Sequence, residues 1–452
     1  MTRLLYTLLV WLVQPLLVRK LRKRARAEPG YGHAIEQRFG DYRGVQRAPA
    51  NAAVPTPASA SPLALTAPPS PPALTIWVHA VSLGEARAAA VLVQQLRAAL
   101  PGMRLVLTHG TATGWEQGQA LLQPGDVQVW QPWDTPRAVQ RFLAHFQPCM
   151  GLLVETEVWP NLVHFCAQAG VPLCLVNARM SAQSLRKAQR LAWLSRPAFA
   201  GLAAVWAQTE EDAARLRQLS APVHGVVGNL KFDAAPNPAQ LQAARAWRAT
   251  LDQPVVMFAS AREGEEQLWL DAVKAQAAVY KDSGAAAQAL QWLIVPRHPQ
   301  RFDAVAELFT KAGLTVSRRS SWTDAPVPAD VWLGDSLGEM ALYFGLADVA
   351  LLGGSFAPLG GQNLIEAAAC GCPVVMGPHT FNFAHAAQMA QAAGAAFEVD
   401  NLAQALARVD GLLQSGSALA TARKRALGWS QSHRGAAEKT AAAVAEMLRG
   451  KS

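Results

Sequence analysis

Short apolar runs alternate with longer helical patterns along most of the chain from position 76 onward. In the first half these runs are "IWVHAV", "LVLTHG", "VQVWQP", "GLLVETEV", "PLCLVNA", "AAVWAQT" and "VHGVVGNL". After a passage rich in Pro, Asn and Gln at 234–240 they restart as "PVVMFAS", "WLIVPR", "DVWLGD", "VALLGGS" and "PVVMGP". Such alternation is typical of a parallel sheet with helices on both faces. The pattern therefore predicts an α/β protein with two doubly wound, Rossmann-like domains in tandem and a cleft between them.

Length and composition agree with two domains. The chain has 452 residues, of which 51% are hydrophobic, and this exceeds what a single core usually supports. Its five cysteines lie in apolar runs and lack the C-x-x-C spacing of a zinc site. We therefore expect reduced core thiols in a cytosolic setting at Cys149, Cys166, Cys174, Cys370 and Cys372.

The N-terminus predicts a membrane anchor. An uncharged apolar run, "LLYTLLVWLVQPLLV" at 4–18, precedes the basic block "RKLRKRAR" at 19–26, which contributes to a formal net charge of +9. A secretory signal would place its basic residues before the apolar run, whereas here the large block follows it. We interpret residues 1–26 as an anchor whose basic block stays at the anionic cytoplasmic surface. A buried first helix of the globular domain is the alternative.

A second change of composition occurs at 48–74, which is uncharged and rich in Pro, Ala and Ser. This stretch predicts a flexible, partly extended insertion without chemistry of its own. The expected boundaries are an N-terminal domain at 27–235 that includes the insertion, and a C-terminal domain at 236–452.

Carboxylates follow two of the predicted strands in the first domain. The stretch "LLVETEVWPNL" at 152–162 runs from a strand-like segment into Glu155 and Glu157, and Ser82 and Glu85 stand where a strand passes into a helix. Ligands of open α/β sheets bind beyond the carboxyl ends of the strands. Two carboxylates close together raise the pKa of one of them into a range useful for a general base or acid. The alternative for Glu85 is a helix-capping role, since a carboxylate in a first turn favours the helix dipole.

The second domain contains a glycine-dense segment at 351–378. Gly353, Gly354, Gly360 and Gly361 permit close approach of the backbone, and a helix that opens near Asn363 offers N–H groups to a phosphate. Neither G-x-G-x-x-G after a first strand nor G-x-x-x-x-G-K-[ST] is present, which disfavours dinucleotide and nucleoside-triphosphate sites. Glycines that serve only tight turns are the alternative.

One motif indicates a different activity. Residues 334–338 form a G-x-S-x-G pattern around Ser336, with Asp348, His379 and His385 downstream in the order of an α/β serine hydrolase triad. That alternative assigns no task to the carboxylates of the first domain.

Several segments in order resemble the 3-deoxy-D-manno-octulosonic acid (Kdo) transferases of lipopolysaccharide synthesis. They are "HAVSLGE", "ETEVWPN", "VNARMS", "GNLKFD", "VPRHPQRF", "GDSLGEM" and "GGSFAPLGGQNLIEAAACGCPVVMGPHTFNF". The resemblance implies a GT-B glycosyltransferase on the cytoplasmic side of the bacterial inner membrane that moves Kdo from CMP-Kdo to the lipid A precursor. The insertion at 48–74 departs from the family pattern and leaves the motifs intact.

The resemblance also assigns roles to residues. Glu85 takes the position of the general base, and Glu155 and Lys231 take positions of transition-state stabilisation. Contacts to CMP fall on Pro296, Arg297, Leu337, Gly338, Glu339, Asn363, Leu364, Ile365 and Glu366. No metal, cofactor or nucleic acid is expected, and the chain contains no Asp-x-Asp motif. The number of Kdo units transferred, the oligomeric state and the role of Glu157 stay open.

Overall fold

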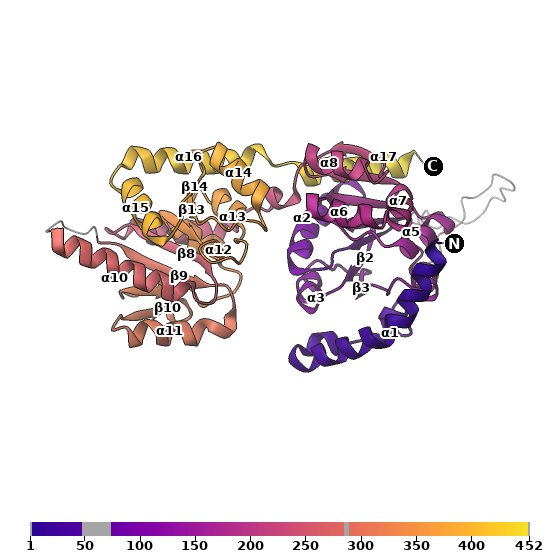
Figure 1. Cartoon of the computed structure of the whole chain (residues 1–452), viewed down its shortest axis with the longest axis horizontal. Coiled ribbons are helices and arrows are strands. Elements are labelled where there is room, and N and C mark those ends of the chain that lie inside the picture. The colour runs from indigo at the N-terminus through magenta and orange to yellow at the C-terminus, as the bar shows by residue number, and fades with distance from the viewer. Residues whose placement is uncertain (1, 48–73, 284–288, 451–452) are drawn as a thin grey trace, which may run out of the picture. The chain divides into compact units, whose positions relative to one another are not determined.

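The structure is a computed structural model that describes residues 2–47, 74–283 and 289–450 (Figure 1). The chain divides into two compact units. Unit 1 comprises Met1–Asp233 and Arg434–Ser452, and unit 2 comprises Ala234–His433. The predicted insertion at 48–74 lies, apart from Leu74, outside the described residues.

Unit 1 is built on a seven-stranded parallel sheet with the order β3-β2-β1-β4-β5-β6-β7. Its strands are β1 Thr75–His79, β2 Arg104–His109, β3 Val127–Trp130, β4 Met150–Val154, β5 Leu173–Ala178, β6 Ala204–Ala207 and β7 Val223–Val226. The α-helices are α1 Thr2–Ala27, α2 Leu83–Ala99, α3 Ala112–Gln119, α4 Pro136–Phe146, α5 Pro160–Gln168, α6 Ala182–Arg190, α7 Ala192–Ala200, α8 Glu210–Arg217 and α17 Ala436–Arg449. Three 3₁₀ helices, η1 Pro29–Gly32, η2 Ile35–Phe39 and η3 Leu230–Asp233, complete this unit as far as the structure describes it.

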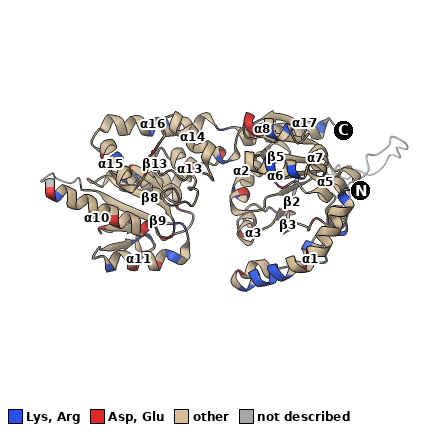
Figure 2. Ribbon diagram, in the orientation of Figure 1, with Lys and Arg blue, Asp and Glu red and all other residues tan. Residues whose placement is uncertain are grey.

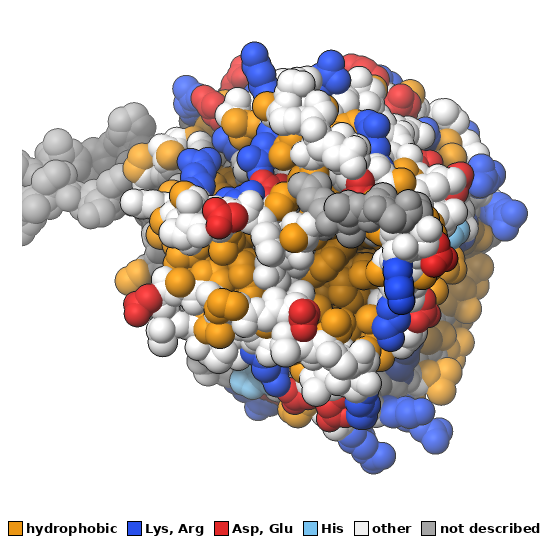
Figure 3. All heavy atoms as spheres, turned by 90° about the vertical axis from the view of Figure 1, so that its left-hand side faces the viewer, with side chains coloured by type: hydrophobic (Ala, Val, Ile, Leu, Met, Phe, Trp, Pro, Cys, Tyr) orange, Lys and Arg blue, Asp and Glu red, His pale blue; other side chains and the backbone are white. Residues whose placement is uncertain are grey.

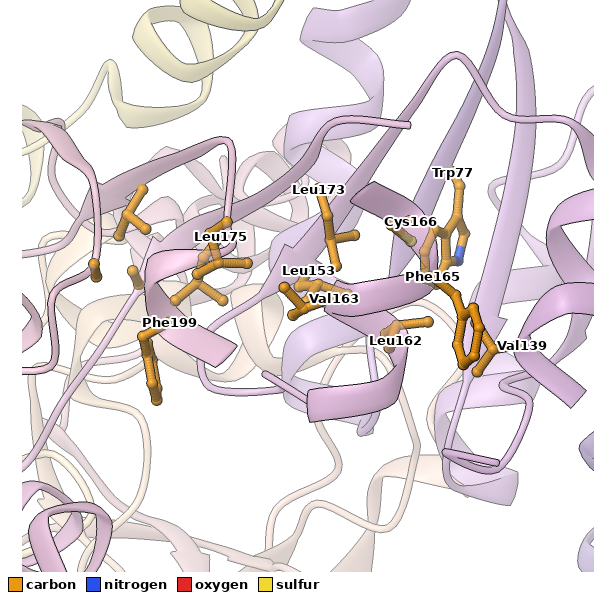
Figure 4. Packing of buried hydrophobic residues seen from close by; sticks show 14 of the residues in the cluster. Trp77, Val139, Leu153, Leu162, Val163, Phe165, Cys166, Leu173, Leu175 and Phe199 are labelled. Atoms are coloured by element: carbon orange, nitrogen blue, oxygen red, sulfur yellow. The ribbon is translucent and has the colours of Figure 1, made fainter. Parts of the chain in front are cut away.

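Both faces of this sheet are buried, which explains why its strands read as continuous apolar runs. In β1, Trp77 packs in one core, whereas its neighbours Ile76 and Val78 pack in the core on the opposite face. Figure 4 shows Trp77 of β1, Leu153 of β4 and helix α5 contributing to the first of these cores. Because successive side chains of a strand point to opposite faces of the sheet, each face packs against its own layer of helices.

Unit 2 repeats this architecture with a seven-stranded parallel sheet of order β10-β11-β9-β8-β12-β13-β14. Its strands are β8 Val255–Ala261, β9 Gln291–Pro296, β10 Val316–Arg318, β11 Val331–Leu333, β12 Val349–Leu352, β13 Val374–Met376 and β14 Ala396–Glu398. The α-helices are α9 Pro238–Ala249, α10 Glu265–Ser283, α11 Phe302–Lys311, α12 Met340–Leu346, α13 Leu364–Ala369, α14 Ala384–Ala392, α15 Leu402–Leu413 and α16 Gly416–Ser432, with 3₁₀ helices η4 Pro299–Arg301 and η5 Arg319–Ser321. The prediction of two Rossmann-like domains is therefore confirmed, and the cleft between them stays a prediction.

The surface of unit 2 also carries some apolar side chains. Figure 3, which looks onto the side of the molecule with α10 and α11, shows hydrophobic atoms at the surface between charged ones. Trp269, Trp292 and Leu314 line a cavity of about 480 Å³ near the amino ends of β9 and β11. Because this cavity lies at the amino ends of the strands, it is remote from the edge where ligands of such sheets bind.

The C-terminal segment corrects the expected domain boundaries. We expected residues 236–452 to form the second domain, but residues 434–452 belong to unit 1. Helix α17 packs against α2 and η3, and Val444 and Ala441 are part of a core of unit 1. The carboxylate of Asp233, the last residue of η3, accepts hydrogen bonds from the backbone N–H groups of Gly435 and Ala437 and so caps α17.

This cap predicts a measurable loss of stability. Asp233→Ala should lower the free energy of unfolding of unit 1 by about 1–2 kcal/mol, because the first N–H groups of α17 lose their acceptor. Glu438→Ala is the matched control, since Glu438 is an exposed carboxylate in the first turn of the same helix. Urea unfolding followed by circular dichroism measures both variants. Equal effects of the two substitutions would contradict the role of Asp233.

Candidate active site

Glu85 lies in the first turn of α2, the helix that follows the carboxyl end of β1, a central strand of unit 1. Its carboxylate accepts a hydrogen bond from the backbone N–H of Val81 at 2.8 Å and one from the hydroxyl of Ser82 at 3.2 Å. Ser82 is in turn the N-cap of α2 and accepts from the backbone N–H of Glu85. This arrangement is similar to a capping box, except that the carboxylate accepts the N–H of Val81 instead of the N–H of the N-cap residue Ser82, so the helix-capping role considered for Glu85 is real.

Besides capping the helix, the carboxyl of Glu85 has a raised pKa. Burial first, and then the negative charges of Glu155 and Glu157, raise the pKa of its carboxyl from 4.5 to about 7 against the opposing hydrogen bonds of Val81 and Ser82. A carboxyl with a pKa near neutrality exchanges protons readily at physiological pH. The charges of Glu155 and Glu157, which follow a neighbouring strand, therefore act on Glu85 as we expected.

Glu155 follows β4 directly and is 8% exposed. Its oxygen Oε1 accepts a hydrogen bond from Nζ of Lys231 at 3.0 Å, which makes a largely buried ion pair. The backbone of Glu155 has a φ of 66°, a left-handed conformation that is unfavourable for a residue with a side chain. Backbone strain of this kind persists where the surrounding structure imposes it, and it is common at functional sites.

The position of Lys231 depends on a second polar residue with a left-handed backbone. Asn177, fully buried near the end of β5, has a φ of 51° and accepts the backbone N–H of Leu230 at 3.0 Å. That bond fixes the start of η3, from which Lys231 reaches Glu155. The motifs "ETE", "VNA" and "GNLKFD", which lie far apart in the sequence, thus form one arrangement.

Glu157 does not share the geometry of Glu155. Strand β4 ends at Val154, so the alternation of side chains along the strand does not set the direction of Glu157. Its carboxylate accepts a hydrogen bond from the indole N–H of Trp159 at 2.8 Å, and burial raises its pKa. Glu157 therefore acts on Glu85 through its charge.

The residues predicted to contact CMP lie in unit 2 in two groups. Pro296 ends β9, and the side chain of Arg297 donates to Gln362 at 3.1 Å, next to Asn363. Asn363 caps α13 by accepting the N–H of Ile365, and Leu364, Ile365 and Glu366 form the first turn of that six-residue helix. The carboxyl end of β9 and the start of α13 are therefore brought together.

The second group is the loop between β11 and α12. Leu337 is 74% exposed, and Gly338 has a φ of 80°, which glycine adopts without strain. Glu339 accepts from Arg319 at 2.8 Å, and the carbonyl of Gly338 accepts from Gln240 at 3.0 Å. The hydrogen bonds found here tie this loop to η5 and α9, and none of them reaches the Asn363 group within the described residues.

The glycine-dense segment differs from our expectation. We expected Gly353 and Gly354 to let the backbone approach a phosphate, but a side chain of the protein takes that place. The fully buried carboxylate of Glu265 accepts the N–H of Gly354 at 2.6 Å and those of Phe356 and Ala357 at 3.2 and 3.3 Å. These N–H groups therefore hold a carboxylate from the start of α10 rather than being open to a ligand. The sequence offered only a weak signal for this residue, a Gly-Glu-Glu stretch after β8.

Ser336 lacks the surroundings of a hydrolase nucleophile. Its hydroxyl forms hydrogen bonds with the carboxylate of Glu339 and the hydroxyl of Tyr343, so the groups that contact it include no histidine. Asp348 accepts from Arg248 and Arg423 instead of orienting a histidine. The hydrolase alternative thus has no support in this geometry.

Metal binding is a separate question. Across the residues that the structure describes, no three or more His, Cys, Asp or Glu side chains gather as a metal site would require. The expectation of a reaction without a metal stays a prediction.

Comparison with known proteins identifies the family. Residues 33–234 match the family model described as "3-Deoxy-D-manno-octulosonic-acid transferase (kdotransferase)". Over 386 residues the chain is 47% identical to the 3-deoxy-D-manno-octulosonic acid transferase of Bordetella pertussis, a match that covers 84% of this chain and 89% of that protein. The chain belongs to the Kdo transferase family.

A second relative agrees with this assignment, and a solved structure shares the fold. The 3-deoxy-D-manno-octulosonic acid transferase of Haemophilus influenzae is 32% identical over 92% of this chain and 91% of its own length. A glycosyltransferase from Rickettsia africae matches in structure with a TM-score of 0.54 at 12% identity, covering 84% of this chain and all of that one, and this likeness concerns the fold alone. The resemblance predicted from the motifs is confirmed, and this Kdo transferase family member is a glycosyltransferase with two Rossmann-like domains.

The environment of Glu85 predicts a dependence of stability on pH. Its folded-state pKa of about 7 lies above the ordinary value of 4.5, so the folded state binds the proton more tightly and loses stability as the pH rises from about 4.5 to 7. Glu85→Gln cannot ionise and escapes this loss. Relative to wild type, the variant should gain up to about 3 kcal/mol in free energy of unfolding between pH 5 and pH 8.

Urea unfolding at the two pH values measures this gain. Glu116→Gln, an exposed substitution on α3, is the control and should have the same effect at both pH values. A pH-independent effect of Glu85→Gln would show that the folded state does not hold the proton more tightly.

Proposed function

We propose that this enzyme transfers Kdo from CMP-Kdo to the lipid A precursor, lipid IVA, in the synthesis of the lipopolysaccharide core. The observation that carries the proposal is the identity to Kdo transferases over most of the chain, together with the arrangement of Glu85, Glu155 and Lys231 at one sheet edge. The reaction inverts the anomeric carbon, because the acceptor hydroxyl attacks opposite the departing CMP.

Glu85 is the general base in this proposal. A sugar hydroxyl is a poor nucleophile until a base takes its proton, and a base is most effective when its pKa lies near the working pH. The burial of Glu85 and the two neighbouring carboxylates bring its pKa to about 7, which suits that task. The hydrogen bond from Val81 holds the carboxylate in a fixed position.

Lys231 supplies positive charge for the transition state. Kdo carries a carboxylate, and negative charge develops on the departing phosphate, so a fixed cation lowers the energy of the transition state. The ion pair with Glu155 holds Lys231 in place, and Glu155 in turn keeps negative charge near Glu85.

Unit 2 binds the donor in this proposal. Arg297 offsets negative charge on the phosphate, Glu366 accepts from the ribose hydroxyls, and the backbone at Asn363 and the loop Leu337–Gly338–Glu339 complete the contacts to CMP. The hydrogen bond from Arg297 to Gln362 supports this assignment, because it joins the end of β9 to the segment that starts α13. Fixed cationic side chains take the part that a metal ion has in other glycosyltransferases.

The acceptor is a membrane lipid, which agrees with the N-terminus. Helix α1 is long and apolar enough to cross a membrane, and it is the only helix of this kind in the part of the chain that the structure describes. We propose that the enzyme works at the cytoplasmic side of the inner membrane and binds no nucleic acid.

Incubation with CMP-Kdo and lipid IVA tests the function. Mass spectrometry of the lipid should show added Kdo, and β-configured donor should give an α-linked product. Glu85→Gln should lower turnover by about 10²–10⁴-fold with donor binding nearly intact, because it removes the base and keeps the size of the side chain. Glu116→Gln is the control and should keep wild-type turnover. A covalent Kdo-enzyme intermediate or a retained configuration would exclude this mechanism, and full turnover by Glu85→Gln would exclude the base.

Calorimetry tests the donor site separately. Arg297→Ala and Glu366→Ala should each weaken CMP-Kdo binding by about 10-fold or more, since each removes a charged partner of the nucleotide. Lys274→Ala, an exposed change on α10, should leave binding unchanged. Unaltered affinity in both site variants would place the nucleotide elsewhere.

A further inference from the structure

Exposed apolar side chains are concentrated on α1. Nine of the nineteen large hydrophobic side chains that are exposed in the described residues lie on this one helix. They are Leu4, Leu5, Leu8, Leu9, Trp11, Leu12, Val13, Leu16 and Leu17. An apolar surface of this extent on a soluble domain marks a site of interaction with a membrane or another protein.

The opposite face of α1 lies against unit 1 along the whole helix. Half-buried residues recur every three or four positions, which is the spacing of one helical face. They are Arg3, Tyr6, Thr7, Val10, Gln14, Val18, Leu21 and Ala25. The helix therefore has an apolar exposed face and a mixed, partly polar face towards the protein.

Hydrogen bonds attach the amino-terminal end of α1 to unit 1. Oδ1 of the fully buried Asn161 accepts from Arg3 at 3.2 Å and from Thr7 at 3.0 Å. The hydroxyl of Tyr6 hydrogen-bonds to Asp134, which also accepts the backbone N–H of Asn161 at 3.0 Å. If the helix left this position, the buried Asn161 and Asp134 would lose these partners, which is costly for buried polar groups.

The carboxyl-terminal end of α1 is attached as well. The guanidinium of Arg24 lies 4.1 Å from the ring centre of Tyr31 in η1, and η1 packs against α3. At the other end α1 packs against α5 and α7, so the helix follows the edge of unit 1 between these places (Figure 1). A helix that crosses a bilayer needs lipid on all sides and would carry Arg3 to the far surface, which the contacts at both ends oppose.

Helices α6 and α7 continue the same surface. Helix α7 packs against α1, and Leu191 and Trp193 at its start are 50% and 43% exposed. Exposed basic side chains follow on the same two helices at Arg186, Lys187, Arg190 and Arg196, and α1 adds its basic block near its end (Figure 2). Neither residues 2–27 nor residues 182–200 contain an acidic side chain. A surface that combines apolar and basic groups without acidic ones complements an anionic lipid monolayer.

We propose that α1 does not cross the bilayer but lies in the plane of its cytoplasmic surface, with α6 and α7 forming the rest of one lipid-binding face. The inference rests on the membrane association in the proposed function and adds how α1, α6 and α7 lie relative to the bilayer. Asn161 belongs to the same "ETEVWPN" motif as Glu155. Docking of α1 on Asn161 therefore sets the distance between Glu155 and the lipid surface.

An N-terminal epitope tag on the full-length enzyme distinguishes the two orientations. With α1 in the plane of the surface, protease should remove the tag in inside-out membrane vesicles and leave it intact in right-side-out vesicles. With α1 across the bilayer and its basic block in the cytoplasm, the two results are exchanged, and that outcome would overturn the proposal. The assay reports orientation alone, so loss of Kdo transfer would count against the proposed function and not against this inference.

Vesicle sedimentation tests the part of α6. Lys187→Gln together with Arg190→Gln should weaken binding of the purified full chain to vesicles of phosphatidylglycerol and phosphatidylcholine by about 25-fold, or about five-fold for each charge. Lys274→Gln with Lys281→Gln on α10 removes the same charge elsewhere and should not change binding. Equal binding by both double variants, or a chain that dimerises through α1 and ignores the vesicles, would contradict a lipid-binding face on these helices.

Discussion

The ion pair between Lys231 and Glu155 is the interaction on which the polar edge of unit 1 depends. Three carboxylates, those of Glu85, Glu155 and Glu157, follow strands β1 and β4, and burial raises the pKa of Glu85 and of Glu157. Lys231 balances one of these charges directly. Removing one partner of a buried pair leaves the charge of the other uncompensated, so Glu155 and Lys231 depend on each other, while the bond from Leu230 to Asn177 fixes the start of η3.

The same short segment links the candidate site to the end of the chain. Asp233, two residues after Lys231, caps α17, and that helix completes a core of unit 1 after the chain has passed through unit 2. The position of Lys231 therefore depends on a helix that lies about two hundred residues further on in the sequence. Helix α1 is tied through Asn161 to the start of α5, the helix that follows Glu155 and Glu157 in the chain.

Local patterns were sufficient to predict the two sheets and the sites of Glu85 and Glu155, because strands buried on both faces leave continuous apolar runs and the residues that follow them lie at the ligand edge. The features that the sequence did not predict are side chains that bind backbone groups far away in the chain. The carboxylate of Glu265 accepts the backbone N–H of Gly354, and that of Asp233 caps α17. Such contacts have no periodicity and need no neighbouring motif, so a carboxylate that makes one looks no different in the sequence from an ordinary polar residue.

The contrast between Glu85 and Glu265 shows what makes a buried carboxylate reactive. Glu265 accepts four backbone N–H groups, those of Arg262, Gly354, Phe356 and Ala357, and these hydrogen bonds fix the surrounding loop. Glu85 accepts only one backbone N–H and one hydroxyl and faces two further negative charges, so its charged form is poorly stabilised. The first arrangement gives a carboxylate that supports a loop, whereas the second gives a carboxylate whose affinity for a proton is high enough to serve as a base.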